Sequence, residues 1–378
     1  MTKKNLLFAI NVDWYFDLHW KERILSEMTS DFDVTICYSR TKGAVSGHSP
    51  KTILLNIQRS NINPFSNFLS LLSARAILHH HSFDFIHAVT IKPNLYFGIL
   101  ARMYCKPIVI TIPGLGSAFS SDGIKFILLR KLIRFLYRFI GKNKKAHYVF
   151  ENQKDRDHFL EKRICTTDNC TVVSGAGVDL EKFIYTKEIY NVSNQIDVLF
   201  AGRLLKGKGL EDLINAITLI NSSERRVNLY IAGITDTDSI DAIPSNQIKD
   251  WHSSGKINYL GKVENMAELL SQVHILALPT KYGEGLPRIL IEANACGRPV
   301  ITTDIAGCNE FVIDGVNGFL VSPDCIDELV GAIERLLDPD IRVKMGLAGR
   351  KRVEKSYTKE HIINQYKAIY KKVKLAGE

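Results

Sequence analysis

Short runs of apolar and β-branched residues alternate with helical patterns along almost the whole chain, and this alternation restricts the possible folds more than any other feature. In the first half we expect strands at residues 6–11, 34–38, 85–87, 108–112, 147–150 and 171–173. In the second half we expect them at residues 197–201, 228–232, 257–260, 275–278 and 300–303. The helical patterns between them are long enough to return the chain to a parallel neighbouring strand. The sequence therefore predicts an α/β protein with doubly wound parallel sheets, covered by helices on both faces.

The chain has 378 residues, which is long for one hydrophobic core, so two domains are expected. The best candidate for a linker is the polar stretch at residues 185–195. We therefore predict a first domain at residues 1–186 and a second at residues 187–356. The last segment, residues 357–378, carries apolar residues at helical spacing and is predicted to form a helix.

The composition is that of a soluble globular protein, with 46% apolar residues. No apolar run approaches the roughly 20 residues needed to span a bilayer. The N-terminal residues are expected to form a strand and not a secretory signal. Seven cysteines without a Cys-x-x-Cys pair favour reduced thiols in the cytoplasm.

Positive charge is concentrated in the first half of the chain. Residues 1–186 contain 25 Lys and Arg against 15 Asp and Glu, a net charge of +10, whereas residues 187–378 contain 24 against 25, a net charge of −1. The excess therefore belongs to the predicted first domain, which indicates that this domain meets an anionic surface.

One segment of the first domain, residues 124–150, contains eight basic residues and no acidic one. Treated as a helix over residues 126–145, it gathers six basic residues on one side: Arg130, Lys131, Arg134, Arg138, Lys142 and Lys145. A broad face rich in Phe and Leu lies beside them, as is typical of an interfacial helix. We predict that Arg130, Lys131, Arg134 and Arg138 dock on an anionic membrane. The alternative is a helix packed in the core with a solvated basic face.

A glycine-rich basic loop at residues 202–209 follows one of the expected strands and leads into an amphipathic helix. Gly202 allows a close approach of the backbone, Arg203 can bind two phosphate oxygens, and Lys208 adds a point charge. The alternative is a solvated basic turn. A strand, a flexible turn and a helix start with two cations nevertheless indicate an anion site.

A second motif, residues 282–293, carries Glu284 and Glu292 on either side of a Gly-Leu-Pro turn. The turn opens into a helix predicted at residues 288–296, and the free amides at that helix end suit a phosphate. Glu292, two turns further on, can accept hydrogen bonds from sugar hydroxyls.

These two motifs resemble the Glu-x7-Glu signature and the Gly-Arg-Leu…Lys-Gly element of retaining glycosyltransferases of family 4. The resemblance implies the GT-B fold, in which two doubly wound domains face a cleft and the C-terminal helix crosses back to the first domain. It also implies transfer, with retention, of a hexose or N-acetylhexosamine from a nucleotide diphosphate sugar, with UDP as the favoured nucleotide.

The resemblance assigns catalytic roles to Arg203, Lys208 and Glu284. The two cations would neutralise the leaving diphosphate, with Lys206 as an alternative to Lys208, and Glu284 would lie near the transferred sugar. The full donor-binding set is Gly202, Arg203, Lys208, Val263, Glu284, Gly285, Leu286, Pro287 and Glu292. Fixed cations and helix amides can stabilise the departing charge, so no metal or other cofactor is expected. Asp236 and Asp238 have the spacing of a metal-binding pair but are predicted to lie in a polar turn.

The first domain is expected to bind the acceptor, in loops that follow its strands, where doubly wound sheets bind ligands. The candidate residues are Asn11, Asp13, Lys92, Gly114 and Gly116. Many family members have a glycine pair after the first strand and a histidine near the second of these loops, at residues 113–117, and this chain has neither. Its loops instead resemble a bacterial subgroup that extends lipid-linked surface or N-linked oligosaccharides. This resemblance implies a polyprenyl-diphosphate-linked acceptor and a protein held at the cytoplasmic face of the membrane.

Two other functions are compatible with parts of the pattern. A nucleotide-sugar epimerase can share the fold and would consume a UDP-sugar without an acceptor. A non-enzymatic basic scaffold would bind lipid or nucleic acid, but it would leave the set Arg203, Lys208, Glu284 and Glu292 without a role. Nothing in the sequence resembles a base-reading module, so nucleic acid is not expected as a partner.

Overall fold

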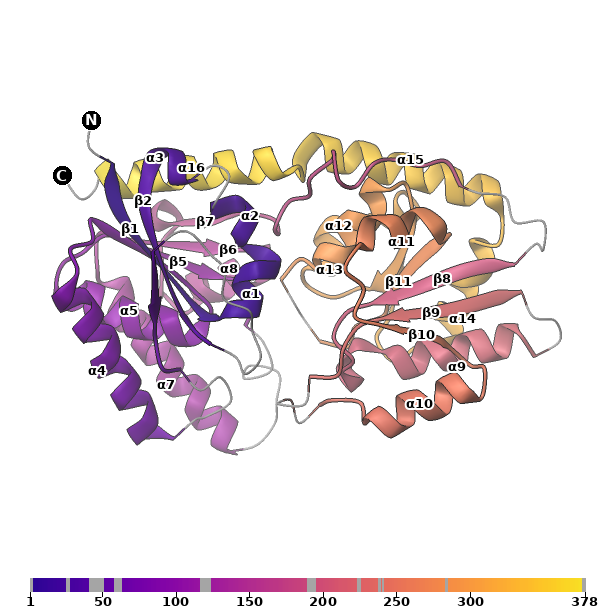
Figure 1. The fold of residues 1–378 in the computed structure, drawn as a ribbon, viewed down its shortest axis with the longest axis horizontal. Coiled ribbons are helices and arrows are strands. Elements are labelled where there is room, and N and C mark those ends of the chain that lie inside the picture. Colours follow the sequence, from indigo (N-terminus) through magenta and orange to yellow (C-terminus); the bar gives the residue numbers. More distant parts are fainter. Residues whose placement is uncertain are drawn as a thin grey trace. The chain divides into compact units, whose positions relative to one another are not determined.

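The structure is a computed structural model that describes residues 3–24, 28–40, 51–57, 63–115, 124–188, 195–222, 226–236, 239, 241–282 and 285–375. The chain forms two compact units (Figure 1). Unit 1 consists of residues 1–176 together with 360–378, and unit 2 consists of residues 177–359. The division lies earlier in the chain than the boundary expected after residue 186.

A seven-stranded parallel sheet, in the order β3-β2-β1-β4-β5-β6-β7, forms the centre of unit 1. Its strands are β1 (Lys4–Val12), β2 (Phe32–Ser39), β3 (Thr52–Leu54), β4 (Phe85–Val89), β5 (Ile108–Ile112), β6 (Ala146–Phe150) and β7 (Cys170–Val172). Ile110 of β5 lies in register with Ala88 of β4 and Tyr148 of β6. Every residue of β4, β5 and β6 is buried, because helices cover both faces of the sheet.

On one face of this sheet lie α4 (Pro64–His80), α5 (Ile91–Met103), α7 (Ile124–Gly141) and α8 (Gln153–Glu161). On the other face lie α1 (Asp13–His19), α2 (Lys21–Arg23) and α16 (Lys359–Leu375), and the one-turn helix α3 (Thr29–Asp31) precedes β2. Each helical layer has its own apolar core against the sheet, as expected of a doubly wound fold.

The C-terminal helix α16 packs in unit 1, which confirms the prediction that this helix joins the first domain. Tyr366 and Tyr370 are buried, and the Tyr370 hydroxyl lies 2.5 Å from Nδ1 of His87. Nε2 of His87 lies 2.7 Å from Oγ1 of Thr111. Burial, and secondarily the charge of Arg23, lower the pKa of His87, so this ring is neutral in the folded protein.

Unit 2 contains a six-stranded parallel sheet in the order β10-β9-β8-β11-β12-β13. Its strands are β8 (Ile196–Ala201), β9 (Val227–Ala232), β10 (Asn258–Gly261), β11 (Ile275–Leu278), β12 (Val300–Thr303) and β13 (Gly318–Val321). Its helices are α9 (Leu210–Ile220), α10 (Ser245–Ser253), α11 (Met266–Gln272), α12 (Arg288–Ala295), α13 (Cys308–Phe311), α14 (Ile326–Arg335) and α15 (Pro339–Ser356). Leu213, Ile291 and Ile333 join α9, α12 and α14 to the same core.

Every predicted strand forms, so the parallel α/β architecture is confirmed. The edge strands β3 and β13 were not predicted from the sequence. The helix predicted at residues 126–145 ends at Gly141. Asn143 then turns the chain, and its Oδ1 accepts a hydrogen bond from the backbone amide of Lys145 at 3.1 Å. Lys142 and Lys145 were expected to extend the basic side of this helix, and this expectation was wrong because the helix ends before them.

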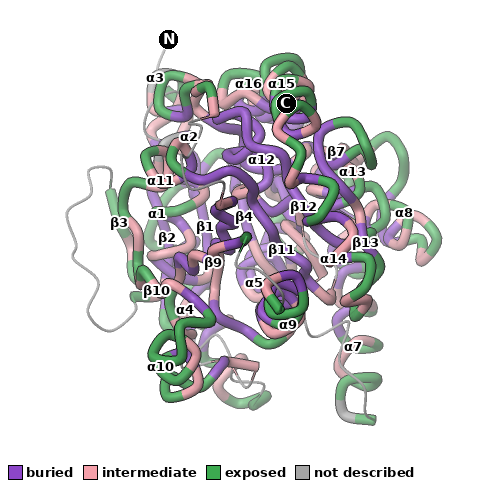
Figure 2. The backbone as a smooth tube through the Cα atoms, turned by 90° about the vertical axis from the view of Figure 1, so that its right-hand side faces the viewer, coloured by how far each residue is buried: buried purple, intermediate pink, exposed green. Residues whose placement is uncertain are grey.

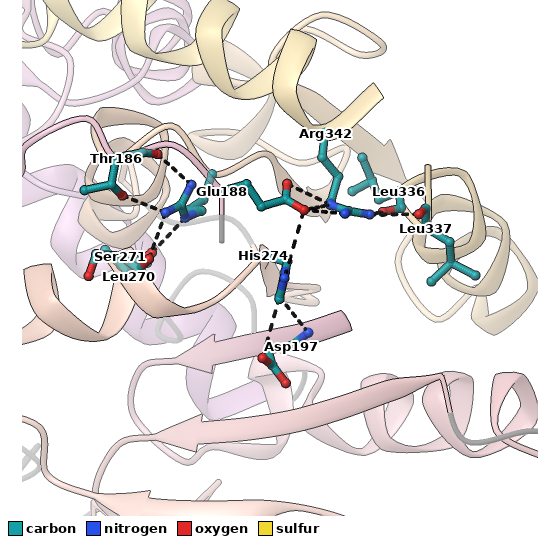
Figure 3. A network of polar contacts seen from close by, with 10 residues as sticks. Thr186, Glu188, Asp197, Leu270, Ser271, His274, Leu336, Leu337 and Arg342 are labelled. Atoms are coloured by element: carbon teal, nitrogen blue, oxygen red, sulfur yellow. Dashed lines mark hydrogen bonds and ion pairs between the residues drawn. The ribbon is translucent and has the colours of Figure 1, made fainter. Parts of the chain in front are cut away.

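A buried polar network holds the start of the expected linker in unit 2 (Figure 3). The Glu188 carboxylate accepts a hydrogen bond from Nε of Arg342 at 3.0 Å and lies 4.0 Å from Nε2 of His274. NH1 of Arg298 donates to the carbonyl of Thr186 at 3.0 Å. Residues 185–188 are thus part of unit 2 and not of a free linker.

Candidate active site

The loop at residues 202–209 leaves β8 and enters α9 through a 3₁₀ turn, Lys206–Lys208. Gly209 has a φ of 75°, and a Cβ there would lie 2.0 Å from the carbonyl oxygen of Pro279. Only glycine meets both conditions. The end of the loop is therefore held tightly against the segment that follows β11.

The segment after β9 braces the other side of this loop. Leu204 donates its amide to the Ile234 carbonyl and accepts from the amide of Ile243, both at 3.0 Å. Asp241 accepts from the amide of Gly207 through Oδ2 at 3.0 Å. These bonds fix the backbone before any ligand binds, so we call residues 202–209 the cradle.

Arg203 and Lys208 lie near the two ends of the cradle. NH1 of Arg203 forms an ion pair with Oδ2 of Asp236 at 3.0 Å, and 37% of the Arg203 side chain is exposed. Lys208 is buried, and its Nζ lies 5.8 Å from the ring centroid of Tyr282. An accessible guanidinium and a confined ammonium in one rigid loop suit an extended anion such as a diphosphate.

The second motif lies directly against the cradle, because Lys281 donates its amide to the Gly207 carbonyl at 2.7 Å. Glu284 lies outside the described residues. Beyond it, Leu286 is buried in the core, and Pro287 precedes α12. No side chain of the described residues caps this helix start, which leaves its amides for a ligand or solvent.

Glu292 lies in the second turn of α12 and is buried. Its Oε1 accepts a hydrogen bond from Nε of Arg288, one turn earlier, at 2.6 Å. The pair fixes the direction of the Glu292 carboxylate, as a residue that reads sugar hydroxyls requires.

The described donor-side residues all follow the carboxyl ends of parallel strands. Gly202, Arg203 and Lys208 follow β8, and Gly285, Leu286, Pro287 and Glu292 follow its neighbour β11. Val263 follows β10, the outermost strand, and lies two strands away from β8. The fold thus brings the two motifs together at the carboxyl ends of two neighbouring strands, where α/β proteins bind ligands.

A third lysine at the cradle has its own partners. Nζ of Lys281 lies 2.8 Å from a carboxylate oxygen of Asp212 and 2.6 Å from one of Asp324. Desolvation opposes ionisation, but the two carboxylates outweigh it and raise the pKa of Lys281. Neither the Lys281 cluster nor the pairing of Asp236 with Arg203 could be recognised from the sequence, because the partners are distant along the chain.

In unit 1 the candidate acceptor residues follow three neighbouring strands. Asn11 lies near the end of β1, and Asp13 begins α1, where its Oδ1 accepts from the next backbone amide at 2.8 Å. Lys92 is half-buried in the first turn of α5 after β4, and burial lowers its pKa. Gly114 follows β5, and Gly116 lies outside the described residues.

Thr90, between β4 and α5, is a residue that sequence reasoning missed. Its φ of 73° is rare for a β-branched side chain, and such strain is concentrated at functional sites. The neighbouring Asn94 is fully buried, and its side-chain Nδ2 donates to the Thr111 carbonyl at 2.9 Å. The start of α5 is therefore tied to β5 beside the candidate acceptor residues.

Models of known protein families match residues in both units of the chain. Residues 5–143 match the family model described as Glycosyl transferase 4-like, and residues 195–339 match the model described as Glycosyl transferases group 1. The chain belongs to this family of glycosyltransferases. The resemblance of the two motifs to family-4 enzymes is thereby confirmed.

Several relatives of this glycosyltransferase span most of its length. The N,N'-diacetylbacillosaminyl-diphospho-undecaprenol alpha-1,3-N-acetylgalactosaminyltransferase of Campylobacter jejuni is 29% identical over 85% of this chain and 86% of its own. The UDP-Gal:alpha-D-GlcNAc-diphosphoundecaprenol alpha-1,3-galactosyltransferase of Escherichia coli is 23% identical over 82% and 81%. A solved structure, sucrose-phosphate synthase of Thermosynechococcus elongatus, aligns over 99% of this chain and 100% of its own, with a TM-score of 0.81 at 19% identity. This likeness confirms the GT-B fold.

The predicted membrane-docking residues of this glycosyltransferase lie on α7. Lys131 and Arg138 are exposed, and Arg130 and Arg134 are half-buried. Nε of Arg138 donates to the Lys162 carbonyl at 2.9 Å, so this residue also anchors the helix. Among the residues of α7 whose burial is described, only Ile133, Tyr137 and Ile140 are buried. Among the described residues, no helix is both long and apolar enough to cross a bilayer.

Proposed function

We propose that this glycosyltransferase transfers a hexose or N-acetylhexosamine from a UDP-sugar to a polyprenyl-diphosphate-linked glycan, with retention at the anomeric carbon. The observation that carries the proposal is the rigid cradle, in which Arg203 and Lys208 adjoin the second motif. The names of the Campylobacter and Escherichia relatives support it, since both specify undecaprenyl-diphosphate-linked substrates and one specifies UDP-Gal.

In the transfer, an acceptor hydroxyl bonds to the anomeric carbon and passes its proton to the leaving diphosphate. The bond between that carbon and the β-phosphate oxygen breaks, and negative charge develops on the leaving nucleotide diphosphate. Arg203 would bind two of its oxygens and Lys208 would supply a point charge. Because hydrogen bonds hold the cradle before the donor arrives, these cations need little reorganisation to stabilise that charge. The amides at the start of α12 would add partial positive charge.

The remaining donor residues would bind the nucleoside and the sugar. Glu292, oriented by Arg288, would accept hydrogen bonds from the ribose hydroxyls. Glu284 and Gly285 would lie beside the transferred sugar. Retention is proposed because the Glu-x7-Glu motif resembles that of retaining enzymes.

We also propose that no metal takes part, since the two cations supply the positive charge that a divalent ion would supply. Activity should then persist in EDTA. Complete loss of activity, restored by magnesium or manganese, would contradict this part of the proposal.

The acceptor would bind at the carboxyl edge of the unit 1 sheet, where Lys92 meets an acceptor phosphate and Asn11, Asp13, Gly114 and Gly116 meet sugar groups. A lipid-linked acceptor requires the protein to work at a membrane surface. We propose the cytoplasmic face, with the basic side chains of α7 attracted to anionic lipid.

The rival function is that of a nucleotide-sugar epimerase. It needs the same donor contacts but no acceptor. Conversion of the UDP-sugar without any acceptor would favour the epimerase, whereas donor consumption that depends on a lipid-linked glycan would favour transfer.

The first experiment is a panel of UDP- and GDP-sugars tested for protection against thermal unfolding. The true donor should raise the midpoint by mass action, and this protection should be weaker in Arg203→Ala. A glycan linked to undecaprenyl diphosphate is then added with the selected donor. Failure to elongate any such glycan would refute the proposed acceptor class.

A further inference from the structure

Exposed phenylalanines occur on only two helices of the described part of the chain. They are Phe65 and Phe68 on α4 and Phe126, Phe135 and Phe139 on α7. Large apolar patches on soluble proteins mark interaction sites, so these two helices share a feature that stability does not explain.

On α7 the exposure is extensive. Leu128 is 60% exposed, Leu132 is 53% exposed and Phe135 is 66% exposed. These residues belong to the broad apolar face that the sequence analysis recognised. Core packing therefore uses only a narrow stripe of this helix.

The position of α7 explains this exposure. Nδ2 of Asn94 lies 3.4 Å from the Tyr137 hydroxyl, and a Cβ on Gly98 would lie 2.7 Å from the Ile140 side chain. The two helices therefore run side by side in the same direction, with Asn94, in the first turn of α5, level with Tyr137. The start of α5 is then level with about residue 134, and the roughly 15 Å of α7 before that point extends beyond it. In Figure 2 this part of α7 appears as a mostly exposed segment at the lower right.

α4 flanks α5 on its other side. Like α7, it has one exposed part and one part that packs in the core. The Tyr96 hydroxyl of α5 donates to Oδ1 of Asn67 at 2.6 Å, which fixes the first half of α4 beside the first half of α5. Phe65 is 70% exposed and Phe68 is 55% exposed in that half, and Leu69 and Leu72 are exposed with them. The second half is held in the core by Ala74, Ile77 and Leu78.

The exposed half of α4 and the exposed part of α7 both lie at the carboxyl ends of the sheet strands. The candidate acceptor residues lie at the same ends. A helix that connects parallel strands runs antiparallel to them, so it begins at their carboxyl ends. Lys92, in the first turn of α5, lies between α4 and α7 in this layer.

Charge identifies the partner. Neither α4 nor α7 contains an aspartate or glutamate, whereas α7 carries Arg130, Lys131, Arg134 and Arg138. Phe and Leu side chains with only basic residues beside them fit the interface of an anionic bilayer. A second copy of the chain would bring like charges together and is disfavoured.

We propose that the first half of α4 and the part of α7 before Tyr137 form one membrane-docking surface, whose Phe and Leu side chains enter an anionic bilayer. The basic residues of α7 attract the protein to the lipid, and the apolar residues of both helices hold it there. With the protein docked in this way, Lys92 would lie at the level of the lipid phosphates. That Lys92 meets an acceptor phosphate there rests on the proposed function, in which the acceptor is lipid-linked.

The test is co-sedimentation with vesicles of phosphatidylglycerol and phosphatidylcholine. Two double variants are compared with wild type: Phe65→Ser/Phe68→Ser on α4 and Leu128→Ser/Phe135→Ser on α7. The matched control is Ile184→Ser/Leu219→Ser, which removes two apolar side chains that are 61% and 56% exposed in unit 2. Each docking variant should lower partitioning at least about tenfold, and the control should match wild type.

Several outcomes would overturn the surface. If the α4 variant partitions like wild type, α4 is not part of it, and if both variants do, there is no such surface. Equal binding to phosphatidylcholine alone would contradict the anionic partner. A wild-type dimer in lipid-free solution that both variants dissociate would assign the face to a second copy.

Two further measurements separate this proposal from the proposed function. Thermal protection by the donor sugar should be unchanged in both variants, because their substitutions lie outside unit 2. Transfer to a detergent-solubilised acceptor should persist, whereas transfer to the same acceptor in vesicles should fall. Normal vesicle binding with no transfer would leave the surface intact and refute the function instead.

Discussion

The guanidinium of Arg203 lies 3.0 Å from the carboxylate of Asp236, and this pair joins the cradle to the segment after β9. Asp236 is mostly buried, with 14% of its side chain exposed, while Arg203 is more accessible. The aspartate therefore fixes one side of the guanidinium and leaves another side toward solvent. This arrangement suits the role proposed for Arg203, which is to bind the diphosphate of the donor.

We predict that Asp236→Ala raises the KM for the donor roughly threefold to tenfold with a smaller change in kcat, because Arg203 loses its orientation. Arg203→Ala should lower turnover roughly a hundredfold or more. In the Arg203→Ala background, Asp236→Ala should have no further effect. Additive losses in this double-mutant cycle would show that Asp236 acts independently of Arg203.

Lys208→Ala should lower kcat roughly a hundredfold or more and leave the fold intact, since the ammonium would stabilise charge formed only as the diphosphate leaves. The control is Lys206→Ala, an exposed lysine of the same loop. Steady-state kinetics of the two variants show which of the two lysines contacts the diphosphate. A larger loss in the Lys206 variant would assign the diphosphate contact to that residue.

Glu292→Gln should weaken donor binding about tenfold, because an amide accepts ribose hydroxyl bonds less strongly than a carboxylate held by Arg288. Glu284→Gln should reduce kcat more than donor affinity. Isothermal titration with UDP and steady-state kinetics measure the two effects. The reverse pattern would mean that the two glutamates have exchanged roles.

Glu188→Gln should destabilise unit 2 by about 3 kcal/mol, because it leaves the buried Arg342 without its counter-charge. The measurement is urea unfolding, with amide hydrogen exchange to assign the change to unit 2. Lys187→Gln is the control, since its side chain is exposed. Equal stabilities for the two variants would show that the network in Figure 3 contributes little.

Unit 1 should lose stability as the pH falls from 6.5 to about 4. Burial, with a smaller effect of Lys372, lowers the pKa of His147 from 6.5 to about 4. In that window the unfolded chain binds a proton at His147 and the folded protein does not, so acid favours unfolding by up to about 1.4 kcal/mol per pH unit.

The variant His147→Gln tests this dependence. Glutamine keeps a polar group near Oγ1 of Thr171, which lies 2.8 Å from Nε2 of His147, but it does not titrate. Its unfolding midpoint should fall less steeply with pH than that of wild type. A residual slope is expected, because the pKa of His87 is lowered too. Parallel curves for the two proteins would contradict the assignment.

Much of the fold could be predicted because strand and helix patterns are local. The buried strands β5, β11 and β12 have the predicted bounds, since their apolar runs are continuous and end at Gly, Pro or polar residues. The cradle was recognisable for the same reason, because Gly202, Arg203 and Lys208 lie within a few residues of one another.

Contacts between distant residues could not be predicted. Arg342 lies 154 positions from Glu188, so residues that look like a polar linker are in fact anchored in unit 2. Asp236 lies in a turn, as predicted, with its carbonyl accepting from the amide of Ser239, but its ion pair with Arg203 could not be predicted. The strain at Thr90 has no sequence signal, because a β-branched residue normally avoids that φ.

The sequence by itself determined two parallel α/β units and the two motifs that mark a glycosyltransferase, because periodicity and close spacing are written in neighbouring residues. Only the tertiary structure decided which apolar side chains are used in the core. The pattern of α7 shows a broad apolar face, but whether that face is buried depends on how far α5 extends beside it. Burial is a property of neighbours in space, so the exposure of Leu128 and Phe135 became visible only in the folded chain.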